Sequence, residues 1–306
     1  MLRDGLLPLL VCPECHSNLS LTVKISEGDE IKDGLLKCTS CPEVFPIIRS
    51  IPRFVSSDKY VRSFSAQWNL FSRTQLNARE NRETFTNKTG LLPEQLAGSL
   101  VLEAGCGMGR FLEVVSKDPS ATVVGFDLSL AVESAFANIG ARRNVQIVQA
   151  DIMNPPFRQG SFDVVFSIGV LHHTSNPKLA FGKLVPLLKR DGQIAIWVYS
   201  KPKRPYLSDF YRIFTSRMPW SFVLALSRLL AKTYRLNLAS RYVQVILPIS
   251  PLPNPEQRLL DTFDWYSPKY QFKFTLAEVE SWFRQTHLRE VKAQSFPVSM
   301  SGRKMG

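Results

Sequence analysis

The sequence predicts an α/β protein in which a doubly wound parallel sheet follows a small cysteine-bearing unit and carries a helical insertion. Short apolar runs and helical segments alternate from residue 99 to residue 200. Two Cys-x-x-Cys pairs lie in the first 55 residues, and a basic, aromatic stretch at 201–262 interrupts the alternation. Such alternation is typical of a parallel sheet, because each parallel pair of strands needs a crossover helix.

Five segments follow from this pattern. They are a cysteine-bearing unit (1–55), a helical linker and lid (56–98), the core (99–200), a basic helical cap (201–262) and the C-terminal completion of the sheet (263–306). The predicted core strands are 99–105, 121–129, 145–151, 161–171 and 193–200, and the helices between them are 110–118, 130–140 and 177–192. A capped helix and one last strand are expected within 275–295.

The chain is basic, with 38 Lys and Arg against 26 Asp and Glu in 306 residues and a net charge of +12. Such a charge favours anionic partners, namely nucleic acid, phosphorylated substrates or a membrane surface. No apolar run is long enough to cross a bilayer. The N-terminus lacks the cleavage site of a signal peptide, so we expect a cytoplasmic location.

Two cysteine pairs are spaced as in a tetrahedral zinc site. The pairs are Cys12 with Cys15 and Cys38 with Cys41. Four thiolates complete the coordination of a structural Zn²⁺ and leave no open position for catalysis. The total of five cysteines is odd, which argues against a complete disulfide framework. A redox-active pair, or His16 in place of one cysteine ligand, is the alternative.

A glycine loop follows the first core strand. The segment VLEAGCGMGRF places Gly105, Gly107 and Gly109 between this strand and the next helix. Glycines let the backbone turn tightly and approach a ligand, although an ordinary strand–helix turn also uses them. Asp127 and Asp151 end the next two strands, so these groups meet at the carboxyl edge of the sheet. There Asp127 suits ribose hydroxyls, and Asp151 suits an adenine amino group.

These motifs, with SFDVVFSIGVLHHT and LLKRDGQIAIWVYS after them, stand in the order found in class I S-adenosylmethionine-dependent methyltransferases, and residues 99–200 resemble that family. The resemblance implies a Rossmann-like, seven-stranded sheet that binds S-adenosylmethionine. It implies that the methionine end lies at Glu103 and at Gly105, Gly107 and Gly109, the ribose at Asp127, the adenine at Asp151 and Ile152, and the sulfonium beside Gly169.

The segment LHHTSNP follows the fourth strand, where the resemblance places the transferred methyl group. A histidine can remove a proton from a hydroxyl near neutral pH, so His173 is the candidate general base, ahead of His172. Because sulfonium methyl transfer often needs only positioning, both histidines can instead shape the pocket floor. NPPF at 154–157 matches a motif of amine methyltransferases, but it precedes the fourth strand, so we expect it to form a turn. Cys106 is expected to line the pocket.

The N-terminal unit resembles a second family. Residues 8–55, with GLLKCTSCPEVFPIIRSIPRFV, are similar to the zinc-ribbon family that includes the small activator partner of tRNA and protein methyltransferases. With FSAQWN at 64–69, the chain resembles bacterial proteins that join a ribbon to a methyltransferase domain. Such a ribbon binds RNA or covers an apolar face of its neighbour. The acids between the two cysteine pairs suit phosphate poorly, so we expect the covering role.

The basic stretch at 201–247 holds most of the excess positive charge. It contains nine Lys or Arg and one acid, Asp209, interleaved with aromatic residues. Three interpretations stay open: an RNA surface, in which cations bind phosphates and aromatic rings stack on bases; an amphipathic helix within 219–232 that lies on a membrane; and a packed cap with a solvated basic face.

The segment FDWYSPKYQF at 263–272 precedes the final helix. We expect Asp264, Trp265, Tyr266 and Tyr270 either to close over the substrate or to pack as a loop against the sheet.

The main hypothesis is an enzyme that transfers a methyl group from S-adenosylmethionine to an oxygen or nitrogen nucleophile of a small-molecule, carbohydrate or lipid-type metabolite. An RNA methyltransferase that uses the ribbon and the cap to hold RNA is the second. A non-catalytic regulator that binds the cofactor is the third, but the intact glycine loop, Asp127 and Asp151 argue against a degenerate pocket. Nucleic acid and a peripheral membrane contact are the alternative partners.

Overall fold

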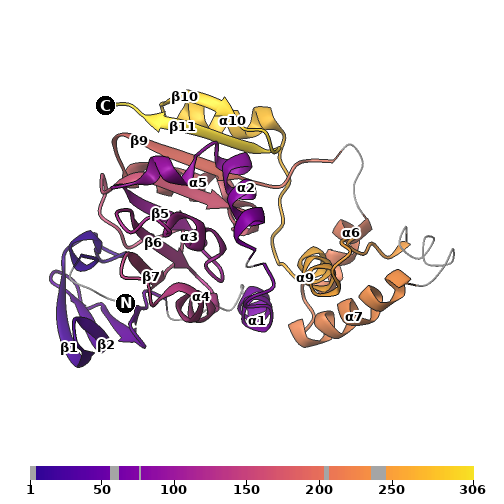
Figure 1. Ribbon diagram of the computed structural model, residues 1–306, viewed down its shortest axis with the longest axis horizontal. Helices are drawn as coiled ribbons and strands as arrows, with labels where there is room; N and C mark the ends of the chain where they lie inside the picture. The colour runs from indigo at the N-terminus through magenta and orange to yellow at the C-terminus, as the bar shows by residue number, and fades with distance from the viewer. Residues whose placement is uncertain (1–4, 56–61, 76, 203–206, 236–245) are drawn as a thin grey trace.

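A seven-stranded mixed sheet forms the centre of the computed structural model (Figure 1), which describes residues 5–55, 62–75, 77–202, 207–235 and 246–306. The strand order is β10-β11-β9-β8-β5-β6-β7. The strands are β5 (Leu100–Ala104), β6 (Thr122–Asp127), β7 (Val145–Gln149), β8 (Phe162–Ile168), β9 (Leu188–Trp197), β10 (Leu288–Ala293) and β11 (Ser299–Lys304). The predicted doubly wound α/β class is confirmed.

Strands β5 to β9 run parallel, which brings their carboxyl ends to one edge. Strand β11 is antiparallel to both of its neighbours, β9 and β10. The first core strand, β5, pairs with β6 on one side and β8 on the other, so the strand order reverses beside it. Folds of this kind bind ligands in the crevice at that reversal.

Helices cover both faces of this sheet. One face packs on α2 (Ala78–Thr89), α3 (Arg110–Val115) and α4 (Ala131–Ile139) in a continuous apolar core. The other packs on α5 (Pro177–Leu184) and α10 (Leu276–Gln285). The expected cap of α10 is present, because Thr275 and Glu278 satisfy each other's backbone N–H groups.

The N-terminal unit forms a separate four-stranded antiparallel sheet after a short 3₁₀ turn, η1 (Leu7–Leu9). Its strands are β1 (Leu19–Glu27), β2 (Glu30–Cys38), β3 (Val44–Ile48) and β4 (Ile51–Pro52). Leu10, Phe45 and Phe54 lie in the same buried core as Phe126 and Val148 of the central sheet. The unit therefore covers the part of that face that α5 and α10 leave free.

The ribbon docks on the β7 side of the central sheet through backbone and side-chain contacts. Val11 N–H donates to the carbonyl of Pro156 (3.0 Å), and Phe54 N–H donates to the carbonyl of Gln149 (2.8 Å). The Arg53 guanidinium donates to Gln149 Oε1 (2.8 Å) and pairs with Glu133 of α4. The segment NPPF, expected to form only a turn, thus supplies part of the docking surface.

The remaining helices connect the sheet to a helical cap. The linker forms α1 (Arg62–Leu70), α2 and the 3₁₀ turn η3 (Pro93–Leu96). Short 3₁₀ turns, η4 (Leu171–His173) and η5 (Val185–Leu187), flank α5. The cap contains α6 (Leu207–Thr215), α7 (Trp220–Lys232), η6 (Thr233–Arg235) and α9 (Pro255–Tyr266). Among the described residues, no helix combines the length and apolarity that a membrane span requires.

Some boundaries of individual elements differ from the expected ones. The helix predicted over 177–192 ends at Leu184, because Pro186 lacks the N–H needed to continue it, and β9 already begins at Leu188. The last strand expected within 275–295 is β10; β11, which follows it and lies between β10 and β9, was not located in advance, although the resemblance implied seven strands. Phe263–Tyr266, for which packing as a loop was one of two expectations, forms the last turn of α9, which crosses the expected segment boundary at 262.

Candidate functional site

The glycine loop lies between β5 and α3 and needs its glycines for steric reasons. Gly105, Gly107 and Gly109 all have positive φ, at 82°, 51° and 87°. A Cβ on Gly105 would lie 2.3 Å from the side chain of Val170. A Cβ on Gly107 would point at Trp68, which lies 3.4 Å away across the cavity wall. The loop backbone is therefore kept open toward the cavity.

Asp127, at the end of β6, fixes the glycine loop and faces the cavity. Its Oδ2 accepts a hydrogen bond from the Gly107 N–H (3.0 Å), and its Oδ1 accepts from the backbone and hydroxyl of Ser129 (2.8 and 2.6 Å). Burial raises the pKa of this carboxyl, while the hydrogen bonds from Ser129 and Gly107 oppose the rise. An oxygen that already orders the loop is also placed to accept a ribose hydroxyl.

Glu103 on β5 is a buried acid whose bonding is incomplete. Its side chain lines the cavity, and its Oε2 has no hydrogen-bond partner among the described residues. Burial raises the pKa of this carboxyl well above its usual range. The ammonium group of a bound methionine would supply the missing partner, so this position fits the methionine end of S-adenosylmethionine.

The predicted residues Asp151, Ile152 and Gly169 line the same cavity. Asp151 follows β7 and accepts the Met153 N–H (2.9 Å), which leaves its second oxygen free of protein donors among the described residues. Gly169 has a φ of 80°, and a Cβ there would lie 3.3 Å from the Trp197 ring. The structure thus brings seven of the eight predicted cofactor residues, and Cys106 with them, to one cavity of about 340 Å³. Gly109, which precedes α3, lies outside the cavity lining, and a Cβ there would lie 2.9 Å from the Ile139 side chain.

Helix α1, which carries the FSAQWN motif, forms a wall of this cavity. Phe64, Gln67 and Trp68 all line it. The Phe64 ring packs on His173 with 4.9 Å between ring centroids, and the buried Gln67 has an Oε1 without a described partner. A linker helix therefore covers the site that the core strands create.

The two histidines after β8 have different environments. His173 lines the cavity, and its Nδ1 donates to the carbonyl of Tyr270 (2.8 Å), since a carbonyl can only accept. The neutral ring therefore keeps its lone pair on Nε2. Burial lowers the pKa of His173, which favours that neutral form. His172 is fully buried, stacks on Tyr199 and lies outside the cavity lining.

Two acids of α9 and a tyrosine after β9 line the cavity near His173. The Tyr199 hydroxyl donates to Asp264 Oδ2 (2.8 Å). Asp261 lies one turn earlier on α9, and burial raises its pKa to about 6. Asp264 was a candidate from the sequence, whereas Tyr199 and Asp261 were not. Trp265 and Tyr266 lie outside the cavity lining and pack in the core of the cap.

A buried lysine, Lys88 at the end of α2, faces the cavity from another side. Its side chain is 8% exposed, and Nζ lies 3.3 Å from the centroid of the Trp197 ring. No described carboxylate lies within ion-pair distance of it. Burial, and secondarily the charge of Arg110, lower the pKa of Lys88 to about 7. The sequence analysis missed this residue, because nothing in α2 marks it as different from a solvated lysine.

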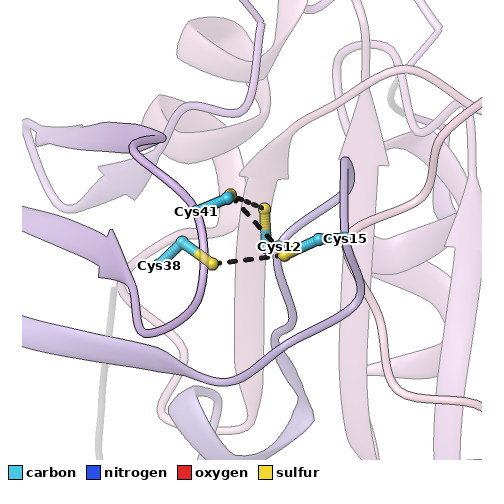
Figure 2. A group of neighbouring side chains, drawn as sticks. All are labelled: Cys12, Cys15, Cys38 and Cys41. Carbon is cyan, nitrogen blue, oxygen red and sulfur yellow. Dashed lines mark hydrogen bonds between the residues drawn. The ribbon is translucent and has the colours of Figure 1, made fainter.

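Cys12 and Cys15 lie between η1 and β1, whereas Cys38 ends β2 and Cys41 lies in the β2–β3 turn. Figure 2 shows that these four predicted metal ligands lie together. Their Sγ atoms all lie within 4.8 Å of one another, with 3.3 Å between Cys15 and Cys38 and 3.6 Å between Cys12 and Cys41. A tetrahedral zinc with Zn–S bonds of about 2.3 Å needs sulfur atoms about 3.8 Å apart. The cluster therefore fits a closed zinc site. His16 is exposed and is not part of this group.

Two family models match separate segments of the chain. A family model described as "Methyltransferase domain" matches residues 102–196. A second model, described as "Trm112p-like protein", matches residues 3–50. The chain therefore joins an N-terminal Trm112p-like domain to a methyltransferase domain.

Several characterised proteins are similar to parts of the chain. A tRNA (carboxymethyluridine(34)-5-O)-methyltransferase of Arabidopsis thaliana is 34% identical over 180 residues, which cover 58% of this chain and 41% of that protein. A malonyl-[acyl-carrier protein] O-methyltransferase of Legionella pneumophila is 37% identical over 100 residues, which cover 32% of this chain and 35% of that protein. The chain thus spans less than half the length of both relatives.

Solved structures show similarity over more of the chain at lower identity. Human N-acetylserotonin methyltransferase with S-adenosylmethionine gives a TM-score of 0.48 at 13% identity, covering 82% of this chain and 61% of that one. A chain from the complex that contains the Haloferax volcanii Trm112 methyltransferase activator also gives 0.48, at 14% identity, covering 79% of this chain and 98% of that one.

Proposed function

We propose that this protein is an S-adenosylmethionine-dependent methyltransferase that acts on an oxygen nucleophile of an anionic small-molecule or lipid-type acceptor. The observation that carries the proposal is one cavity that brings together groups suited to the cofactor and groups suited to an acceptor. We assign Glu103, Asp127 and Asp151 to the cofactor, and Lys88 and His173 to the acceptor.

Bound S-adenosylmethionine supplies an electrophilic methyl group on its sulfonium. Gly169 has no side chain between the end of β8 and the Trp197 ring, which leaves room for the sulfonium and the approaching nucleophile. His173 offers the lone pair of Nε2 to the proton of a hydroxyl acceptor, and its bond to the Tyr270 carbonyl fixes the ring. Helix α1 excludes water from the cofactor side.

Lys88 indicates the charge of the acceptor. A buried ammonium group without a counter-ion is costly, and a bound anion removes that cost. Lys88 contacts the Trp197 ring, and the Trp197 and Tyr199 rings pack with 5.4 Å between their centroids. The Tyr199 hydroxyl, rather than Lys88, bonds to Asp264. The acids of α9 therefore do not neutralise the lysine. Two relatives have names that specify carboxyl-bearing acceptors, carboxymethyluridine and malonyl-acyl-carrier protein, which supports an anionic acceptor group here.

RNA methylation is the second candidate. It is favoured by the relative named as a tRNA methyltransferase, which matches over 58% of this chain. In that case the anionic group would belong to a modified nucleotide that enters the same cavity, and the exposed cations of the cap would contact phosphates.

The experiment that tests the proposal follows label from methyl-labelled S-adenosylmethionine into fractions of a cell extract. We expect label in the metabolite or lipid fraction with wild type and much less with Asp127→Ala at a cofactor concentration near the wild-type Kd. Lys88→Met should bind the cofactor like wild type and label the acceptor at least roughly tenfold more slowly, since a charge-assisted contact is worth about 1.5–3 kcal/mol. Label in RNA would establish the second candidate instead. Tight cofactor binding without label in any fraction would contradict the enzymatic function.

A further inference from the structure

The helical hairpin of α6 and α7 exposes an unusual number of large apolar side chains. Eight of them, from 39% to 63% exposed, form what we call the hairpin patch: Leu207, Phe210, Ile213, Phe214, Met218, Trp220, Phe222 and Leu229. Four lie on one stripe of α6, two lie at the α6–α7 turn, and two lie on the outer side of α7. Figure 1 shows this hairpin beside α9 and away from the central sheet.

The hairpin patch is not the face that packs the cap. The inner side of α6 binds α9, where Tyr211 stacks on Tyr266 and the Thr215 hydroxyl donates to the Tyr266 carbonyl (2.7 Å). The inner side of α7 buries Val223, Leu224 and Leu230 against α9. Both helices therefore have one buried apolar face and a second, exposed one. A packed cap with a solvated basic face explains the first of these faces but not the second.

Positive charge accompanies the hairpin patch. Arg217 follows Phe214 at the end of α6, and Arg228 and Lys232 lie on the exposed side of α7 next to Leu229. No described carboxylate is within ion-pair distance of these three cations. The acid of this region, Asp209, turns inward and pairs with Arg212 and Lys273. The outer surface is thus apolar and cationic, without a balancing acid.

We infer that the hairpin patch docks the protein on an anionic lipid surface. Helices that lie in a membrane interface combine an apolar face containing Trp, Phe and Leu with Lys and Arg at its border. The cations complement the negative headgroups, and the apolar side chains enter the boundary of the acyl region. The bases of an RNA could stack on the aromatic rings. RNA binding would not explain why Leu207, Ile213 and Leu229 are 44%, 51% and 63% exposed.

Docking would also orient the cavity. Helix α9 packs against both hairpin helices and contributes Asp261 and Asp264 to the cavity lining. A lipid surface against the outer side of the hairpin would therefore be linked to the cavity through the hairpin helices and α9. The docking itself is independent of the proposed function, because a protein without transferase activity would still bind vesicles.

The test is co-sedimentation of the full chain with phosphatidylcholine vesicles that do or do not contain phosphatidylglycerol. Wild type should pellet with the anionic vesicles and much less with the neutral ones. The triple variant Phe210→Ser/Phe214→Ser/Phe222→Ser should bind the anionic vesicles at least roughly tenfold more weakly. Arg228→Glu/Lys232→Glu should lose the preference for anionic vesicles.

The matched control is Val23→Ser/Ile25→Ser, which removes two side chains of similar exposure (48% and 54%) from the ribbon and should bind like wild type. Circular dichroism and S-adenosylmethionine affinity check that each variant is folded. Wild type that ignores both kinds of vesicle would overturn the inference, whatever the variants do. So would a triple variant that binds like wild type, or binding to a generic RNA in place of vesicles.

Discussion

Asp127 has two roles in the proposed cofactor site: it orders the glycine loop, and it is the proposed partner of the ribose. Its carboxylate holds the Gly107 N–H and faces the cavity at the same time. We predict that Asp127→Ala weakens S-adenosylmethionine binding roughly 10- to 100-fold, because a charge-assisted hydrogen bond is worth about 1.5–3 kcal/mol. Isothermal titration calorimetry measures the affinity. Asp29→Ala, which removes an exposed acid from the ribbon, is the control for net charge. Equal affinities of wild type and Asp127→Ala would reject the assignment of the ribose site.

His173 gives a prediction about pH. A general base must be neutral, and burial lowers the pKa of this ring below its ordinary value of about 6.5. The neutral form therefore persists to lower pH than in a solvated histidine. We expect kcat to fall only below about pH 6.5. The KM for the acceptor should rise above about pH 7, where the free Lys88 loses its charge.

The variant His173→Gln distinguishes two roles of this residue: a general base and a side chain that only shapes the pocket. A base predicts a large drop in rate and loss of the acid limb of the pH profile, with cofactor affinity kept. A pocket wall predicts a changed KM for the acceptor and an unchanged acid limb. A histidine that only shapes the pocket would thus be recognised by the pH profile, not by activity alone.

At the scale of single residues, the sequence predicts the site residues that belong to local motifs. Glycines with positive φ and acids at strand ends have a local pattern, so Gly105, Gly107 and Asp127 could be placed in advance. Lys88 and Asp261 could not, because each lies on a helix in which no local motif marks it. What distinguishes them is burial beside a cavity, which depends on tertiary packing.

Helix α1 is the element whose role is most directly testable. Trp68 packs over Gly107 and lines the cavity, whereas Leu70 on the same helix is 51% exposed. We predict that Trp68→Ala weakens S-adenosylmethionine binding about tenfold and speeds its dissociation, because about 1.5 kcal/mol of apolar contact is lost. Stopped-flow fluorescence measures the rate. Leu70→Ala should leave it unchanged, and equal rates for both variants would show that α1 does not close the cofactor site.

The elements that the sequence missed share a physical reason. Strand β11, SMSGRK, lacks the apolar alternation of an ordinary strand, yet Ser299–Gly302 are buried because β9 and β10 pair with them on both sides. Burial that results from pairing with neighbouring strands does not produce an alternation of apolar and polar residues in the sequence. The core strands from β5 to β9, by contrast, contain short runs of apolar residues and were recognised by that property.

At the scale of the whole molecule, the ribbon and the methyltransferase domain share one apolar core. Leu10 of the ribbon forms a bridge to Phe157, and Phe157 packs edge-on against Phe126 and Phe162. The sequence predicted that the ribbon covers an apolar face, but it contained no sign of which face. Complementary surfaces on two segments far apart in sequence become recognisable only when both are folded.

This shared core leads to a prediction about zinc. Removal of the ion by a chelator should loosen the turns that carry Cys12, Cys15, Cys38 and Cys41, and with them the residues that pack on the sheet. We therefore expect a single unfolding transition in calorimetry, with its Tm about 5 °C or more lower without metal. Wild-type protein should contain one zinc per chain. Cys41→Ser should lose it and resemble the chelated protein, whereas Cys106→Ala, which removes a buried thiol outside the cluster, should keep it. Two separate transitions, with the upper one insensitive to the chelator, would contradict this: the ribbon would then be an independent unit that contributes no stability to the methyltransferase domain.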